Sequence, residues 1–170
     1  MKTKITVITT AVALLAAVSI TAAVAGPSKG SRASVGVSQS SFGRILVDGR
    51  GHSLYIFAMD RRRMSSCYGA CATNWPPLLS TGKPRVRVGA KRSLIGRTRR
   101  IDGGWQVTYN GHPLYTFVKD TAKGQTNGEG LVAFGAEWDL VSPRGARIVS
   151  DTPTDNGGGS TPPGGYGRYP

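Results

Sequence analysis

The sequence predicts a mostly β protein with a single small domain built from two related β-hairpin repeats. Three observations lead to this prediction. The motif Gly-His-x-Leu-Tyr-x-Phe-x-x-Asp begins at Gly51 and again at Gly111. Short apolar stretches in the middle of the chain are separated by glycine-containing turns, and helical periodicity is nearly absent outside residues 66–75. Both ends of the 170-residue chain have compositions that cannot build a core, so disordered termini are expected.

Residues 1–25 are expected to be a secretory signal peptide. Lys2 and Lys4 make the start positive, an uncharged stretch follows, and Ala23-Val24-Ala25 supplies the small-x-small pattern that precedes cleavage. A retained membrane anchor is the alternative, because the 21 uncharged residues are long enough to span a bilayer. The stretch is only weakly apolar, which favours cleavage after Ala25. No cysteine lies near this point, so lipid attachment is not expected.

The mature chain is predicted to contain one domain between two flexible ends. Residues 26–41 are rich in Gly and Ser and are predicted to be a flexible linker, and residues 151–170 are predicted to be a disordered Gly/Pro-rich tail. Neither segment can bury enough apolar surface to offset the entropy of ordering it. Residues 42–150 are therefore expected to form the β-rich domain.

Each motif copy is expected to form the second strand of a β-hairpin. Residues 44–47 lead into a turn at residues 48–51, and residues 105–109 lead into Asn110-Gly111. Asn-Gly between apolar runs is a strong hairpin signal because both residues tolerate positive φ. Further strands are predicted at residues 86–88, 98–101, 131–134, 138–141 and 146–149, with turns at residues 102–104 and 143–145.

The motif side chains are expected to be structural. Within each strand the tyrosine and phenylalanine are two residues apart, so both rings point to one face and the leucine points to the other. We interpret the aromatic residues as core anchors, with ligand binding as the alternative, and the aspartates as closing Asx-type turns. The motif residues are Tyr55, Phe57 and Asp60 in the first copy and Tyr115, Phe117 and Asp120 in the second.

Taken together, these segments resemble a bacterial family of secreted repeats of unknown function. Its members are often described as predicted lipoproteins with a conserved Tyr-x-aromatic-x-x-Asp motif. The resemblance rests on both motif copies, on residues 67–78 between them and on residues 107–115, and it covers residues 44–145. It implies an exported bacterial domain with no assigned activity. The chain differs from the lipoprotein members because it lacks the lipid-accepting cysteine.

Cys67 and Cys71 are the two cysteines of the chain, and a disulfide between them is expected. The reason is that exported proteins occupy an oxidising compartment. A Cys₂His₂ metal site that adds His52 and His112 is the alternative. No cofactor is otherwise expected.

The sequence has few signs of catalysis, and we expect the protein not to be an enzyme. It contains no Gly-x-Ser-x-Gly motif, and both histidines lie beside turns. Asp60 and Asp120 could act as an acid/base pair if the repeats brought them together. Asp120, Asn127 and Glu129 could bind calcium, but their spacing differs from that of an EF-hand, which favours a flexible loop.

Charge is the most informative remaining feature. Residues 61–101 contain eleven Lys and Arg residues and no acidic residue. Alternation on strands would place Arg85 with Arg87, and Arg97 with Arg99, on common faces. One interpretation is a solvated surface, and the other is a docking surface for an anionic wall polymer or an anionic membrane. Nucleic acid would also bind such a surface, but it is not an expected partner of an exported protein.

The leading hypothesis is therefore an exported, non-catalytic domain that binds at the cell envelope through these arginines. An extracytoplasmic metal-binding or redox protein is the second hypothesis, and an enzyme of unknown reaction is the third.

Overall fold

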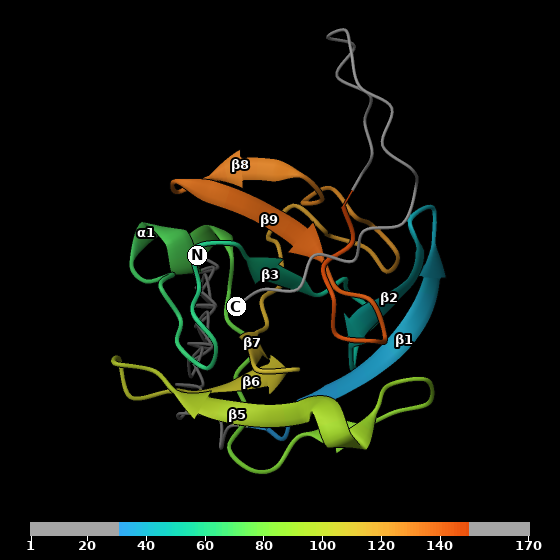
Figure 1. Cartoon of the computed structure of the whole chain (residues 1–170), viewed down its shortest axis with the longest axis horizontal. Coiled ribbons are helices and arrows are strands. Elements are labelled where there is room, and N and C mark those ends of the chain that lie inside the picture. The colour runs from blue at the N-terminus through green and yellow to red at the C-terminus, as the bar shows by residue number, and fades with distance from the viewer. Residues whose placement is uncertain (1–30, 150–170) are drawn as a thin grey trace, which may run out of the picture.

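The computed structural model describes residues 31–149, which form three three-stranded sheets and two short helices (Figure 1). The protein is mostly β, as predicted. Among these residues, no helix has the length and apolar character needed to cross a membrane. The predicted signal peptide and the predicted tail from residue 151 lie outside the described residues.

The first sheet joins β1 (Ser34–Ser40), β2 (Gly43–Asp48) and β4 (Arg85–Val86). β1 is antiparallel to β2 and parallel to β4. The prediction of a flexible linker over residues 26–41 is wrong for β1, which occupies residues 34–40 of that segment. Its composition is poor in large apolar residues, but the ladder with β2 satisfies the backbone of β1, and Val35 is fully buried.

The second sheet has the order β3-β9-β8, with β3 at Tyr55–Phe57, β8 at Leu131–Ala133 and β9 at Ala136–Leu140. β3 and β9 are antiparallel neighbours, so this sheet brings together segments that are about eighty residues apart in the chain. In Figure 1 the β8–β9 pair lies on one side of β3 and the third sheet lies on the other.

The third sheet contains β5 (Ile95–Arg99), β6 (Trp105–Tyr109) and β7 (His112–Pro113). β6 lies in the middle and is antiparallel to both neighbours. The β6–β7 turn has φ of 50° at Asn110 and 84° at Gly111, which confirms the predicted Asn-Gly hairpin.

The helices are short. α1 (Ala70–Asn74) lies within the predicted helical segment, and the 3₁₀ helix η1 (Arg92–Leu94) precedes β5. The last predicted strand, residues 146–149, is reduced to a bridge between Val141 and Arg147.

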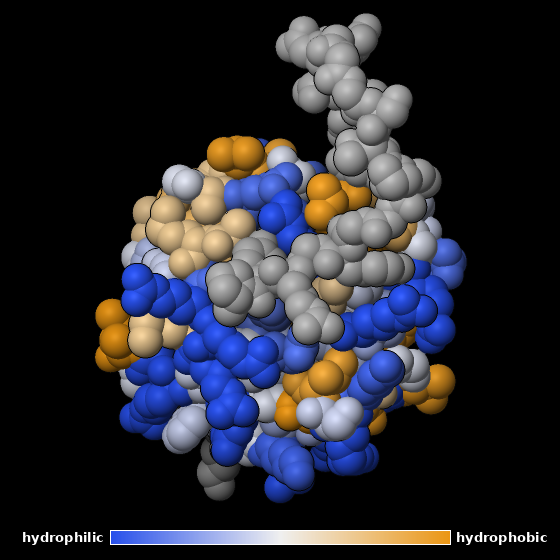
Figure 2. Space-filling view, viewed as in Figure 1, coloured by the Kyte–Doolittle hydropathy of each residue, from blue (hydrophilic) through white to orange (hydrophobic). Residues whose placement is uncertain are grey.

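Two hydrophobic clusters form the core, and the repeats contribute to both. The motif tyrosines and phenylalanines lie in one cluster with Trp75 and Trp138, whereas Leu54 and Leu114 lie in the other. This division confirms the alternation predicted from the motif. Large hydrophobic side chains that remain exposed are scattered among hydrophilic ones on the face in Figure 2.

Candidate functional site

The motif tyrosines and aspartates connect the two repeats. The Tyr55 hydroxyl donates a hydrogen bond to Asp120 Oδ2 at 2.6 Å, and the Tyr115 hydroxyl donates one to Asp60 Oδ2 at 2.7 Å. The backbones of the two tyrosines also pair, with N–O distances of 2.9 and 3.0 Å. Each tyrosine therefore binds the aspartate of the other repeat, and the two repeats make equivalent contacts with each other.

The second oxygen of each aspartate binds its own loop. Asp60 Oδ1 accepts a hydrogen bond from the Ser66 amide, and Asp120 Oδ1 accepts one from the Asn127 amide. These amides are six and seven residues further along the chain, whereas an Asx-type turn uses the amide two residues on. The Asx-turn prediction is therefore wrong, although the aspartates are structural. Each carboxylate is occupied by a tyrosine and an amide, so the two aspartates make separate contacts and do not form an acid/base pair with each other.

Burial affects the ionisation of these groups. It raises the pKa of Asp60 to about 6, although hydrogen bonds from Tyr115 and Ser66 oppose the shift. Burial also raises the pKa of Tyr55, and the hydrogen bond to Asp120 adds to the effect. The tyrosines therefore remain neutral donors.

A stack of four aromatic rings follows the same symmetry. Trp75 and Trp138 stack with ring centroids 3.9 Å apart, and their planes differ by 3°. Phe117 stacks on Trp75 at 4.1 Å, and Phe57 stacks on Trp138 at 4.2 Å. All four rings are at most 7% exposed, so the motif aromatic residues are core anchors rather than a ligand platform.

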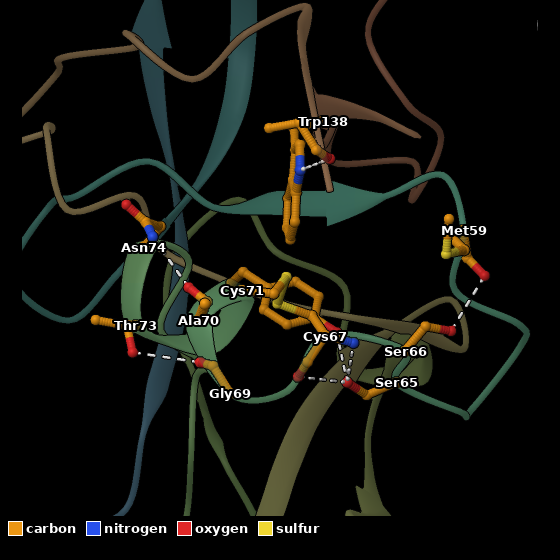
Figure 3. The surroundings of a disulfide bond; sticks show 12 residues. Met59, Ser65, Ser66, Cys67, Gly69, Ala70, Cys71, Thr73, Asn74 and Trp138 are labelled. Carbon is orange, nitrogen blue, oxygen red and sulfur yellow. Dashed lines mark hydrogen bonds between the residues drawn. A yellow bond between two sulfur atoms is a disulfide. The ribbon is translucent and has the colours of Figure 1, made fainter. Parts of the chain in front are cut away.

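Cys67 and Cys71 form the expected disulfide, which lies beside this stack. Figure 3 shows Trp138 directed toward the disulfide, whose Cys71 belongs to α1. The Trp75 amide donates to the Cys71 carbonyl at 2.8 Å, so the bridge holds the turn that places Trp75 in the core.

The structure does not assemble the alternative metal site. Both cysteine sulfurs are in the disulfide, and His52 Nδ1 lies 3.6 Å from Asp48 Oδ2. Burial and the nearby Arg62 lower the pKa of His112. Among residues 31–149, no group of three or more His, Cys, Asp or Glu side chains is arranged to hold a metal ion.

The loop considered for calcium is anchored to the core. Besides the bonds of Asp120, Glu129 Oε2 accepts a hydrogen bond from the Leu140 amide at 2.6 Å. Gly128 lies so close to Trp75 that a Cβ at this position would be 2.7 Å from the indole. The candidate oxygens therefore make separate internal bonds, and this loop contacts the core where a flexible loop was predicted.

The four candidate docking arginines lie at the surface. Arg85, Arg87 and Arg99 are exposed, and Arg97 is partly exposed. Arg97 and Arg99 lie over one ring, with guanidinium carbons 4.8 and 5.5 Å from the Trp105 centroid. This confirms that they share a face of β5. Hydrophilic side chains cover much of the surface around β5 in Figure 2.

The acidic side chains of residues 31–149 are committed to internal contacts. Asp102 and Asp139 pair with Arg100 and Arg147, respectively, and Glu137 also pairs with Arg147. The others, Asp48, Asp60, Asp120 and Glu129, accept hydrogen bonds from backbone amides.

Comparison with known proteins agrees with the internal symmetry. Residues 36–79 and 96–142 each match the family described as a secreted repeat of unknown function, and together they cover more than half of the chain. The chain belongs to this secreted-repeat family. No curated protein matches the chain, and no solved structure does.

The two matched segments explain the arrangement of the core. The first secreted repeat contains Trp75 and the second contains Trp138, so each supplies one tryptophan to the stack. Arg97 and Arg99 lie within the second repeat, whereas Arg85 and Arg87 lie in the segment between the repeats.

The sequence patterns did not indicate the roles of Trp75 and Trp138 in the ring stack or of Trp105 under the arginines. Trp75 and Trp138 are 63 positions apart, close to the sixty-residue offset of the motif, and that spacing could have identified them as equivalent. Trp105 gave no such signal, because its position under two arginines depends on the β5–β6 register.

Proposed function

We propose that this secreted protein acts by binding, without catalysis, and that its arginine surface docks an anionic polymer of the cell envelope. The arginine surface consists of Arg85, Arg87, Arg97 and Arg99. Family membership supports an exported domain, and the charge of these side chains supports a polyanionic partner.

The observation that carries the proposal is that these four charges lack acidic partners within residues 31–149. Arg87 donates to the Gly49 carbonyl and Arg97 to the Ser80 carbonyl, which leaves their net charge uncompensated. In contrast, the buried Arg100 and the partly buried Arg147 pair with carboxylates. The carboxylates thus neutralise Arg100 and Arg147 and leave the four arginines of the surface charged.

A polymer is favoured over a compact ligand because the charges are distributed. Arg85 and Arg87 belong to the first sheet and the segment after it, whereas Arg97 and Arg99 belong to the third sheet. A chain of repeated negative charges can contact several such positions together.

The test measures binding of the protein without residues 1–25 to purified anionic wall polymer at several salt concentrations. We expect affinity to fall steeply with salt, because exposed charges are screened over about 8 Å at physiological ionic strength. Replacing all four arginines of the surface with Gln should weaken binding by roughly a hundredfold to a thousandfold, since each charge near an anionic surface contributes about 1 kcal/mol and about 1.4 kcal/mol is tenfold.

A matched control replaces four other exposed cations, Arg61, Arg62, Lys119 and Arg144, with Gln. This variant has the same net charge as the first, so it separates a localised surface from overall charge. Equal weakening in both variants would contradict the proposal. Tight binding to anionic vesicles without binding to wall polymer would contradict the polymer as partner and identify the membrane.

We also propose that the protein reaches this compartment by cleavage after Ala25 and without a lipid anchor. The support is the small-x-small sequence and the absence of a cysteine beside it. N-terminal sequencing and mass determination of exported protein should identify an unmodified chain beginning at Gly26. A retained N-terminus would overturn this part of the proposal.

A further inference from the structure

An exposed tryptophan lies inside the arginine surface. Trp105 begins β6 and pairs with Arg99 across the β5–β6 ladder. Its side chain is 41% exposed, and both Arg97 and Arg99 lie within 5.5 Å of its ring centroid. This indole therefore offers apolar contact area directly beside two positive charges.

The same indole lines a groove of about 410 Å³. Leu79, Ser80 and the Gly103-Gly104 turn are among the other residues that line it. Gly104 keeps the groove open at this turn, since a Cβ there would lie 3.2 Å from Leu79 Cδ2. The volume is within the range of small-ligand sites, so the groove has room for a sugar ring.

The residues that line the groove are uncharged, and positive charge lies beside it at Arg97 and Arg99, which lie over Trp105. Asp102 lies in the adjoining turn, but Arg100 Nε donates to both of its oxygens at 3.1 and 2.9 Å. Arg97 donates to the Ser80 carbonyl at 3.3 Å, which fixes its guanidinium beside the groove. Arg99 has no carboxylate partner among the described residues.

We propose that this groove, lined by Leu79, Ser80, Gly104 and Trp105 and flanked by Arg97 and Arg99, binds a sugar residue that carries a carboxylate. The C–H face of the sugar would lie against the apolar indole, and its carboxylate would pair with the guanidinium groups. Ser31 and Thr81 also line the groove, are exposed and carry hydroxyl groups that can hydrogen-bond sugar hydroxyls.

This inference rests on the proposed function and specifies its partner. An acidic polypeptide or a phosphatidylglycerol headgroup could satisfy the arginines, but neither has a rigid ring with an apolar C–H face and a rim of hydroxyls. The groove combines these features, because an aromatic wall, a leucine and hydrogen-bonding groups surround the same space.

The experiment compares two polyanions of equal charge by calorimetric titration of the protein without residues 1–25. The probes are an oligogalacturonate and a polyglutamate of the same length, with a neutral galactan as the uncharged sugar. We expect the wild-type protein to prefer oligogalacturonate by about tenfold, the amount that aromatic stacking typically adds. Trp105→Ala should remove this preference and leave polyglutamate binding unchanged.

Several variants make the outcome decisive. Trp105→Phe keeps a ring and should retain most of the preference, whereas the exposed aromatic control Phe134→Ala should retain all of it. Gly104→Val fills the groove without altering Trp105, so it gives an independent test if Trp105→Ala folds poorly. The double variant Arg97→Gln with Arg99→Gln should bind both oligogalacturonate and polyglutamate more weakly.

The two proposals fail in different ways. Equal affinity for both polyanions, or a preference that survives both Trp105→Ala and Gly104→Val, would overturn the saccharide groove and leave the arginine surface standing. Failure of the wild-type protein to bind any polyanion would overturn the proposed function itself.

Discussion

The buried tyrosine–aspartate bonds show how single residues hold the two repeats together. A buried carboxylate is costly unless its oxygens are hydrogen-bonded, and each motif aspartate meets this need with one tyrosine and one amide. Because the tyrosine belongs to the other repeat, each aspartate favours the assembled core over either half.

The first residue-scale prediction concerns Asp60 and pH. Its pKa is about 6 in the folded protein and near 3.8 in the unfolded chain, so the folded state binds the proton more tightly. This contribution to stability is present below pH about 4 and is lost as the pH rises through about 6. Asp60→Asn should flatten the fall in urea-unfolding free energy across this window. Some slope should remain, because burial also raises the pKa of Asp139 to about 7.

Asp102→Asn is the control, because the pKa of Asp102 is shifted in the opposite direction to that of Asp60. The hydrogen bond from Arg100 lowers the pKa of Asp102, so its contribution is present above the unfolded value and is lost as the pH falls. A slope unaffected by Asp60→Asn would mean that Asp60 ionises at its ordinary pH in the folded protein.

The second prediction concerns the aromatic stack. Phe117 is 7% exposed and stacks on Trp75, so Phe117→Ala should lower the free energy of unfolding by about 3 to 5 kcal/mol. Val118→Ala, at a neighbouring position that is 46% exposed, should change it by about 0.5 kcal/mol or less. Urea titration of both variants gives the comparison, and similar values for the two would contradict a core role for Phe117.

Among the elements, α1 depends most on its surroundings. It has five residues and no side-chain hydrogen bond at its N-cap, so its intrinsic helical stability is small. Cys71 holds its buried side against the stack, and the disulfide fixes the preceding turn. The helix thus acts as a support for Trp75.

The element-scale prediction is that the disulfide stabilises the protein without determining the fold. Its two cysteines are four positions apart, and so short a loop is expected to contribute about 2 kcal/mol. Cys67→Ala with Cys71→Ala should lower the unfolding midpoint while the near-ultraviolet circular dichroism of the tryptophans persists. Loss of that signal would show that the bridge is required for the stack.

At the scale of the whole molecule, the two secreted repeats form one core. β3 of the first repeat pairs with β9 of the second, and the ring stack alternates between repeats from Phe57 to Phe117. Neither repeat can satisfy its tyrosine and aspartate alone. Folding is therefore expected to be cooperative across the whole domain.

The corresponding prediction is that the halves do not fold separately. Fragments covering residues 31–82 and 83–149 should each lack a cooperative urea transition, because each would expose one side of the ring stack. Mixing the two fragments should restore the near-ultraviolet circular dichroism of the tryptophans, because the ring stack needs both Trp75 and Trp138. A sharp transition in either fragment alone would contradict the interlocked core.

The sequence by itself determined the β class, the repeat, the second hairpin turn and the disulfide. These features depend on local chemistry: Asn110-Gly111 accepts positive φ, alternation assigns faces, and export favours pairing of Cys67 with Cys71. The sequence also located the arginines, because charge is visible in composition.

Only the tertiary structure decided which partners these residues meet. The β1 strand escaped prediction because its order comes from pairing with β2 rather than from its own apolar content. The exchange of Tyr55 and Tyr115 between Asp120 and Asp60 depends on contacts across 65 and 55 positions of chain. The groove at Trp105 depends on strand register and on the two glycines, Gly103 and Gly104, that precede β6. Such contacts arise from packing distant segments, and no local pattern encodes them.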